Sequence, residues 1–374
     1  MVNRDRIVRD FMALVRIDSE SGKEGAVRDF LCSRLQGMGM EVYEDEAGKA
    51  LEGESGNLFA WKDGKVPGPS IFLSAHMDTV VPGKGVEPLL DDGVIRSAGD
   101  TILGGDDKAG IAAILEALQV IKERNLSHPP LEVIFTVSEE QGLMGSKHLD
   151  FSRVRSKLGY VLDSGGDAGN IIIKAPTQNE FVLTVIGKAA HAGINPEEGL
   201  NAISLAAYAI NHLDIGRIDE ETTCNLGTIH GGRARNIVAD RVEVKGEARS
   251  LSPAKLDALT NEIVTTFRQK VEEKGGRCEV EVVHLYPMID LDPEEPVVQI
   301  AARAARAMGK EPVLGRTGGG SDANIFNGMG IRCANLGIGM EKVHTTEEFI
   351  TVNSLVDSAQ YILQIIEEAG KIES

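Results

Sequence analysis

The sequence predicts an α/β protein with a smaller α+β domain inserted into it, and two patterns support this prediction. Toward both ends of the chain, short apolar runs alternate with segments of helical periodicity. That pattern is typical of a mostly parallel sheet covered by helices on both faces. Between them, the order strand, helix, strand, strand, helix, strand is typical of an open antiparallel sheet with two helices on one face. We therefore expect one α/β domain from residues 1–176 and 286–374, and an inserted domain at 177–285.

The elements of the first segment follow from their periodicity. MVNRDRIVRDFMALV carries charges every few residues, which indicates an amphipathic helix and not the uninterrupted apolar stretch of a signal peptide. Runs such as SIFLSA and LEVIFTVS are nearly continuous in apolar residues, as strands buried on both faces are. We expect helices at 4–16, 24–37 and 108–124, and strands at 57–62, 70–75, 131–138, 159–163 and 170–174.

The pattern changes near residue 177, where QNEFVLTVIGK alternates like a half-exposed strand. The rest of the insertion is expected to contain helices at 200–213 and 253–274 and strands at 224–230, 239–249 and 277–286. After Pro287 the first pattern returns, with helices expected at 295–308 and 351–369 and strands at 312–317 and 333–338.

The composition excludes several kinds of partner. The 374 residues include 39 Lys and Arg against 57 Asp and Glu, a formal net charge of −18, and so negative a protein repels nucleic acid and anionic membranes. The four cysteines have no C-x-x-C spacing, so we expect free thiols in a reducing compartment. The most apolar helix, 109–121, is too short to span a bilayer. We therefore expect a cytoplasmic protein.

Several motifs with histidine or carboxylate side chains stand at strand ends or helix starts. HMDTV follows the strand that leads to His76, at the carboxyl end where open α/β sheets bind ligands. GGDDKAG leads into the helix at 108–124, SEEQG and Asp163 end two further strands, and VHTTEEF adds His344. Each motif alone has an ordinary explanation as a solvated loop or a helix cap. Together they indicate a site.

Neighbouring carboxylates in these motifs suit different tasks. Asp78 lies two residues after His76, close enough to hold the second imidazole nitrogen of a metal-binding histidine. Glu139 and Glu140 follow a strand in which successive side chains point to opposite faces. One of them can therefore bind a metal while the other faces a water as a general base. One aspartate of GGDDKAG can cap the helix while the other turns toward the metal.

The charges of this set indicate two divalent ions. Asp106, Glu140 and Asp163 supply three negative charges, His76 and His344 are neutral, and a bridging hydroxide supplies a fourth. Imidazole and carboxylate without thiolate suit zinc, cobalt or manganese at an open site. Two ions about 3.5–4 Å apart that share a carboxylate and a water form a common hydrolytic arrangement.

These motifs, together with GKAAHAGINPEEGLNAI and GTIHGGRARNIVADRVEVKGEARS, resemble the dizinc exopeptidases from about residue 5 to residue 370. That family includes peptidase T, carboxypeptidase G, succinyl-diaminopimelate desuccinylase and aminoacylase. The resemblance implies a zinc-exopeptidase-like three-layer catalytic domain with an inserted ferredoxin-like lid and dimerisation domain. It also implies a homodimer formed through that insertion.

The resemblance further implies a role for each site residue. Asp78 would orient His76, Glu139 would be the general base, and the Asp106–Asp107 peptide would be cis. Two zinc ions would share Asp106, the first bound by His76, Asp106 and Asp163 and the second by Asp106, Glu140 and His344.

The substrate groups would come from the inserted domain. The resemblance implies that His191 polarises the scissile carbonyl, in relatives often across a dimer, and that Asn236 and Arg249 bind a substrate carbonyl or carboxylate. Because His191 follows one strand of the insertion and Arg249 ends another strand of the same sheet, we expect them to clamp the substrate together when the domains close.

Two details bear on the substrate. Family members with Asp at the position of Asp163 tend to be aminopeptidases or dipeptidases, which favours action on short peptides as in peptidase T. Peptidase T, however, has an Arg where this chain has Gly318, and Arg316 lies two residues away. An N-acyl-amino-acid deacylase or carboxypeptidase therefore stays as an alternative. A noncatalytic metal-binding scaffold is a third hypothesis, which the intact Glu139 disfavours.

Overall fold

The structure is a computed structural model that describes residues 1–372, and the chain folds into two compact units. The first unit consists of Met1–Lys174, Ile289–Thr317 and the chain from Ser321 onward, and the second of Ala175–Met288 with Gly318–Gly320. The second unit begins two residues before the expected insertion, which started at 177, and ends three residues after its expected end at 285.

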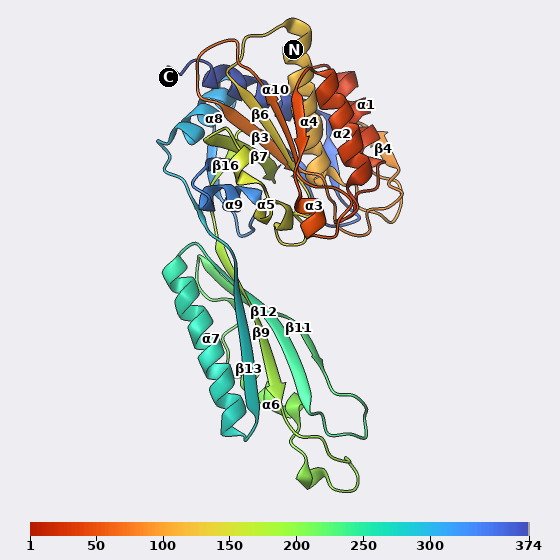
Figure 1. Ribbon diagram of the computed structural model, residues 1–374, viewed down its shortest axis with the longest axis vertical. Helices are drawn as coiled ribbons and strands as arrows, with labels where there is room; N and C mark the ends of the chain where they lie inside the picture. The colour runs from red at the N-terminus through yellow and green to blue at the C-terminus, as the bar shows by residue number, and fades with distance from the viewer. Residues whose placement is uncertain (373–374) are drawn as a thin grey trace. The chain divides into compact units, whose positions relative to one another are not determined.

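The first unit is built on a mixed nine-stranded sheet (Figure 1). Its order is β1 (Glu41–Glu44), β2 (Leu58–Lys62), β6 (Leu131–Thr136), β3 (Ile71–His76), β7 (Leu158–Ser164), β16 (Arg332–Gly337), β8 (Asn170–Ala175) and β14 (Ile289–Asp290), with β15 (Val313–Arg316) paired to β8. The neighbours β6, β3, β7 and β16 are parallel. Toward the edges, β1 and β2 are antiparallel to their neighbours, as is β8 to β16. The predicted parallel sheet is therefore confirmed at its centre, where β3 and β6 are buried along their whole length.

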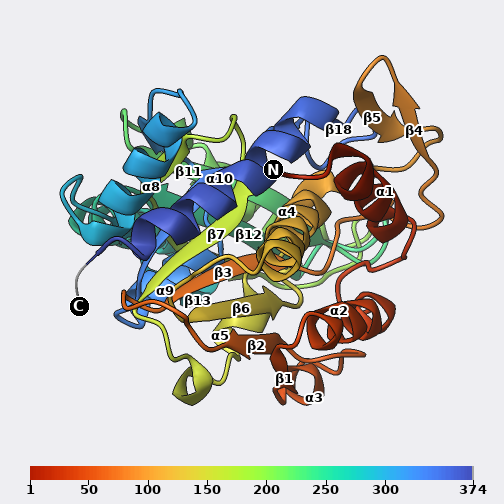
Figure 2. The ribbon, with the colours of Figure 1, turned by 90° about the horizontal axis from the view of Figure 1, so that it is seen from above.

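Helices cover both faces of the central strands, as predicted. On one face, α4 (Gly105–Arg124) and α10 (Val352–Ala369) pack side by side (Figure 2), joined by α1 (Arg4–Val15) and α8 (Pro296–Ala307). Tyr160 of β7 donates a hydrogen bond of 2.9 Å to the carbonyl of Val297 in α8. On the other face lies α9 (Asp322–Gly328), whose Phe326 ring is 4.6 Å from that of Phe72 in β3.

Several short elements of the first unit were not predicted, because they are too short to show a period. They are β1, β14 and α9, whose bounds are given above, together with α3 (Ala47–Ala50), α5 (Met144–Lys147), the turn η1 (Phe151–Arg153) and a four-stranded sheet of β17 (Met340–Glu341), β18 (Phe349–Thr351), β5 (Val94–Ser97) and β4 (Pro88–Asp91). The helix α2 (Gly25–Gly37) matches its prediction to within one residue. The loop between β17 and β18 carries His344, so this small sheet helps to position the site.

The second unit is an antiparallel sheet with two helices on one face. The sheet order is β10 (Gly216–Arg217), β11 (Thr222–Gly231), β12 (Arg241–Ser250), β9 (Thr177–Ile186) and β13 (Arg277–Tyr286), and the helices are α6 (Ala202–Ile210) and α7 (Pro253–Glu273), with a turn η2 (Pro196–Glu198). Apolar side chains of β9, β12, α6 and α7 form one buried core, including Phe181 and Phe267. The ferredoxin-like order predicted for the insertion is confirmed.

Two expectations about the whole chain can be compared with the structure. All four cysteines, Cys32, Cys224, Cys278 and Cys333, are free thiols, as predicted. Among residues 1–372, none of the helices has the length and hydrophobicity needed to cross a membrane.

Candidate metal centre

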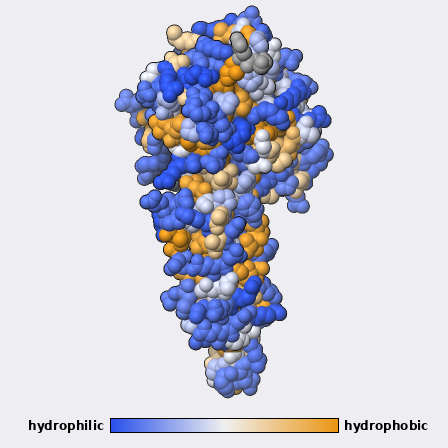
Figure 3. All heavy atoms as spheres, turned by 90° about the vertical axis from the view of Figure 1, so that its left-hand side faces the viewer, coloured by the Kyte–Doolittle hydropathy of each residue, from blue (hydrophilic) through white to orange (hydrophobic). Residues whose placement is uncertain are grey.

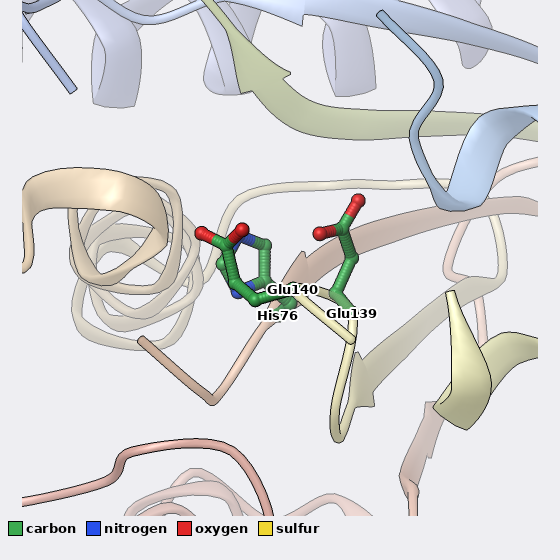
Figure 4. Close-up of side chains that lie close together, drawn as sticks. All are labelled: His76, Glu139 and Glu140. Atoms are coloured by element: carbon green, nitrogen blue, oxygen red, sulfur yellow. The ribbon is translucent and has the colours of Figure 1, made fainter. Parts of the chain in front are cut away.

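Three adjacent parallel strands bring the first part of the site together. His76 is the last residue of β3, Asp163 is the last but one of β7, and Glu139 and Glu140 follow the end of β6. Because β6, β3 and β7 are neighbours and parallel, their carboxyl ends lie at one edge of the sheet. Figure 4 shows His76, Glu139 and Glu140 close together at this edge.

Asp106 enters the site from the start of α4. Gly104, just before the helix, has a φ of +74°, a left-handed conformation that glycine adopts without steric cost. Asp106 and Asp107 have non-helical backbone angles, and the peptide bond between them is cis. The expected cis peptide is confirmed, and the helix begins with a kink that turns Asp106 out of its axis.

The carboxylate of Asp106 lies between the two predicted histidines. Its Oδ1 is 3.0 Å from Nε2 of His76, and its Oδ2 is 3.1 Å from Nε2 of His344. The same His344 nitrogen is 2.8 Å from Oε1 of Glu140. Three sets of possible ligand atoms lie within 4.8 Å of one another: His76, Asp106 and Asp163; Asp106, Glu140 and His344; and His76, Glu139 and Glu140.

The donor set fits divalent metal ions. It offers imidazole nitrogen and carboxylate oxygen without thiolate, which suits zinc, cobalt or manganese. Burial, together with the Asp163 carboxyl, raises the pKa of Glu139 well above its usual range, and burial with Asp106 does the same to the pKa of Asp163. Hydrogen bonds to Asp106 and Glu140 raise the pKa of His344 to about 10. So many buried carboxyl groups favour the binding of cations.

Asp78 does more than the orientation of His76 that was expected. Its Oδ1 lies 3.4 Å from Nδ1 of His76, and this nitrogen is 2.9 Å from the Asp78 carbonyl oxygen. The Asp78 carboxylate also accepts hydrogen bonds from the backbone N–H groups of Glu139, at 2.9 Å, and Glu140, at 3.2 Å. Ser21 donates to it at 2.6 Å. Asp78 therefore fixes both the imidazole and the turn that carries the two glutamates.

Three buried carboxyl groups near the site were missed by the sequence reasoning. Glu24 accepts hydrogen bonds from Gly22 and Ser138 N–H, and Asp322 accepts one of 2.5 Å from the Thr136 hydroxyl. Glu348 accepts hydrogen bonds from the residues that precede and include Asp106. Glu348 stands inside VHTTEEF, a motif singled out from the sequence, and nothing local distinguishes it there from the exposed Glu347.

In the second unit, His191 and Asn236 lie on neighbouring segments. His191 and Ile237 form a β-bridge, and the N–H of Ala192 donates to the carbonyl of Asn236 at 3.0 Å. Both His191 and Asn236 are exposed.

Arg249 lies at the opposite end of the same sheet, so the expected clamp of His191 and Arg249 is wrong for a single chain. His191 follows β9 beyond Ile186, at the end of the sheet where Ile186 pairs with Arg241. Arg249 pairs with Gln178, near the other end of β9. The eight residue-to-residue steps of β12 from Arg241 to Arg249 span about 27 Å at the usual rise of a strand. The sequence showed only that both residues belong to the insertion, not at which end of the sheet each one lies.

The guanidinium of Arg249 already has partners. It donates to Glu247 at 2.9 and 3.1 Å, and to the carbonyl of Gly318 at 3.3 Å. Gly318 is the position at which the sequence departs from the peptidase T pattern, which has an Arg there. Arg316 lies in β15 with its side chain exposed.

The chain is similar to known proteins over its full length. The model of peptidase family M20/M25/M40 matches residues 72–368. The chain is 44% identical over 371 residues to the uncharacterized protein YqjE of Bacillus subtilis, covering 99% of this chain and 100% of that one. It is 27% identical over 413 residues to peptidase T of Escherichia coli strain SE11, covering 99% and 100% of the two chains.

Solved structures agree with this similarity. The aminopeptidase PepT of Bacillus cereus has a TM-score of 0.91 at 44% identity, covering 99% of this chain and 100% of that one. A tripeptidase from Staphylococcus aureus Mu50 has a TM-score of 0.95 at 41% identity, covering 100% of both chains.

Proposed function

Since this chain belongs to peptidase family M20/M25/M40, and is therefore a peptidase, we propose that it is a dinuclear zinc aminopeptidase that acts on short peptides, tripeptides foremost. The observation that carries this proposal is the pair of ligand sets that share Asp106. It is supported by the two solved relatives, an aminopeptidase PepT and a tripeptidase, which are 44% and 41% identical to this chain over nearly its whole length.

The proposed ligands are His76, Asp106 and Asp163 for one ion and Asp106, Glu140 and His344 for the other. When bound, two such ions would polarise the peptide carbonyl and make a water acidic enough to attack it. Zinc is proposed because the donors are imidazole and carboxylate, with cobalt and manganese as substitutes.

Glu139 is the proposed general base. Its carboxylate lies within 4.8 Å of ligand atoms of His76 and Glu140, and it belongs to neither of the sets that share Asp106. It is therefore free to take a proton from water and to pass it to the leaving amine. Burial raises the pKa of Glu139, which favours a carboxyl group that can hold the proton between the water and the leaving amine.

The substrate groups are proposed to come from two copies of the chain. Because His191 and Arg249 lie at opposite ends of one sheet, we assign His191 and Asn236 to the site of a partner copy, and Arg249 to a substrate carboxylate. The second unit exposes Ile203, Ile229 and Ile237 at 46, 53 and 39%. Hydrophobic residues also reach the surface of this unit on the face that Figure 3 shows. Ile237 adjoins Asn236, so a homodimer contact at this end of the sheet would bring His191 and Asn236 to the partner copy.

We also propose a cytoplasmic location, consistent with four free thiols.

A turnover panel tests the activity. The zinc-loaded protein is given tripeptides, dipeptides, N-acetylated tripeptides and N-acetyl amino acids, with Glu139→Gln as the control for contaminating peptidases. We expect tripeptides to lose their N-terminal residue fastest and N-acetylated tripeptides to resist. Faster hydrolysis of N-acetyl amino acids would assign the chain to the deacylase alternative, and no turnover of any of them would favour the noncatalytic scaffold.

A further inference from the structure

We propose that Glu348 is a positioning residue that holds Asp106 and His344 at the separation needed for the second metal ion. This inference rests on the proposed function, because it takes Asp106, Glu140 and His344 as the ligands of that ion. Glu348 has no assigned role and contacts the backbone of the ligand loops, not the proposed ligand atoms.

The carboxylate of Glu348 is buried and accepts three backbone hydrogen bonds. Glu348 is 1% exposed. Oε2 accepts from the N–H groups of Leu103 and Gly104, both at 2.8 Å, and Oε1 accepts from the N–H of Asp106 at 3.0 Å. These donors stand at the start of α4, where the helix dipole favours a negative charge. The turn that carries Asp106 is thus held by one carboxylate.

The same residue also holds the loop of His344. The N–H of Glu348 donates to the carbonyl of Thr345 at 3.2 Å, which closes the turn after His344. The next residue, Phe349, begins β18 and pairs with Arg96. His344 has a φ of +63°, a left-handed conformation that a residue other than glycine keeps only when its surroundings hold it. Glu348 therefore joins two turns that lie 242 residues apart in the chain.

Gly105 supplies an independent observation. A Cβ atom on Gly105 would lie 3.0 Å from Oε1 of Glu348. Because Gly105 has no side chain, the Glu348 carboxylate can approach the N–H of Asp106. The second glycine of GGDDKAG is explained by Glu348 and not by a left-handed conformation, because Gly105 is absent from the residues with positive φ.

The substitution Glu348→Gln tests the role with little change in volume. A carboxamide keeps one acceptor oxygen and turns an NH₂ group toward backbone N–H donors on its other side. The turn of Asp106 must then shift. Glu347→Gln is the matched control, because Glu347 is exposed, pairs with Lys342 and lies next to Glu348.

The experiment measures zinc affinity by competition with a chelator, together with the absorption spectrum of the cobalt-loaded protein. For Glu348→Gln we expect the second ion, of which Glu348 positions two proposed ligands, Asp106 and His344, to bind about 10–100-fold more weakly, as is usual when a residue behind a metal ligand is lost. The other ion should be affected less, and the cobalt band of the weaker site should change. Glu347→Gln should match the unsubstituted protein, and unfolding in EDTA should show that both variants are folded.

Gly105→Ala is a second variant, in case Glu348→Gln fails to fold. It leaves the carboxylate in place but crowds it, and it should also weaken the second ion more than the first. Unchanged affinity for both ions and an unchanged cobalt spectrum, or equal weakening of the two ions, would overturn the inference. If the unsubstituted protein itself bound fewer than two ions, the proposed function would fail instead, so the two failures are distinguishable.

Discussion

At the scale of single residues, the two carboxylate oxygens of Asp106 face different parts of the site. One carboxylate oxygen lies 3.0 Å from His76 and the other 3.1 Å from His344. A single side chain can therefore serve two ions, provided that its backbone is turned out of the helix. Three features accompany this turn: the cis peptide after Asp106, the left-handed conformation of Gly104, and the Glu348 carboxylate that accepts hydrogen bonds from the N–H groups of Gly104 and Asp106.

Glu139 and Glu140 should differ sharply although they are adjacent. Glu139→Gln should retain two zinc ions and lower kcat by about 10²–10⁴-fold, the usual loss when a general base is removed. Glu140→Gln should lower the zinc content, because Oε1 of Glu140 lies 2.8 Å from Nε2 of His344, within the proposed second site. Metal analysis and steady-state kinetics on the same samples check both statements. Near-normal turnover by Glu139→Gln would contradict the assignment.

At the scale of elements, the site depends on how closely α4 approaches the sheet. Asp107 connects the two: its Oδ1 accepts a hydrogen bond of 3.2 Å from the N–H of Gly110, and its Oδ2 accepts one of 3.2 Å from the N–H of His76. A Cβ atom on Gly110 would lie 2.4 Å from Oδ1 of Asp107 and 2.7 Å from the carbonyl oxygen of Leu162 in β7. The helix can pack this closely only because residue 110 has no side chain.

Gly110→Ala should therefore push α4 away from β7 and disturb the metal centre. We expect a loss of about 1–3 kcal/mol in the free energy of unfolding, typical of overpacking, together with weaker zinc binding. Gly37→Ala is the control, because a Cβ atom there would meet nothing within 4 Å. Urea unfolding and zinc titration of both variants check this. Equal stability of the two variants would contradict the close approach of α4.

At the scale of the whole molecule, the position of His191 makes a test of subunit sharing possible. In the proposed homodimer, the site of each chain uses its own Glu139 and the His191 of the partner copy. His191→Ala and Glu139→Gln should each be inactive alone. In a mixed dimer, the His191→Ala chain keeps its own Glu139 and receives an intact His191 from the other chain, so that one site is complete.

Mixing the two inactive variants under conditions that exchange subunits should restore up to about a quarter of the activity, since half of randomly paired dimers are mixed and each has one complete site. The measurement is tripeptide hydrolysis before and after exchange, with each variant exchanged against itself as control. Absence of restoration, with mixed dimers demonstrated by differently tagged chains, would place His191 in the site of its own chain.

The sequence was informative where one local pattern decides one element. The bounds of α1 and α7 were predicted to within one residue, because amphipathic periodicity continues to a clear end. The motif residues His76, Asp106, Glu140, Asp163 and His344 were identified because each stands at a strand end, a helix start or a polar loop. The short β17, β18, β4 and β5 were missed, since two to four residues show no period.

What the sequence by itself determined was the mixed class of the fold, the order of its elements and the kinds of side chain in the site. Those depend on hydrophobic periodicity and on residue chemistry, which are local properties. The tertiary structure alone decided which groups meet. It brought Glu348 to the backbone of Asp106 across 242 residues, and it placed His191 and Arg249 at opposite ends of one sheet. Contacts of that kind follow from strand order and register, and those are set by the packing of the whole chain.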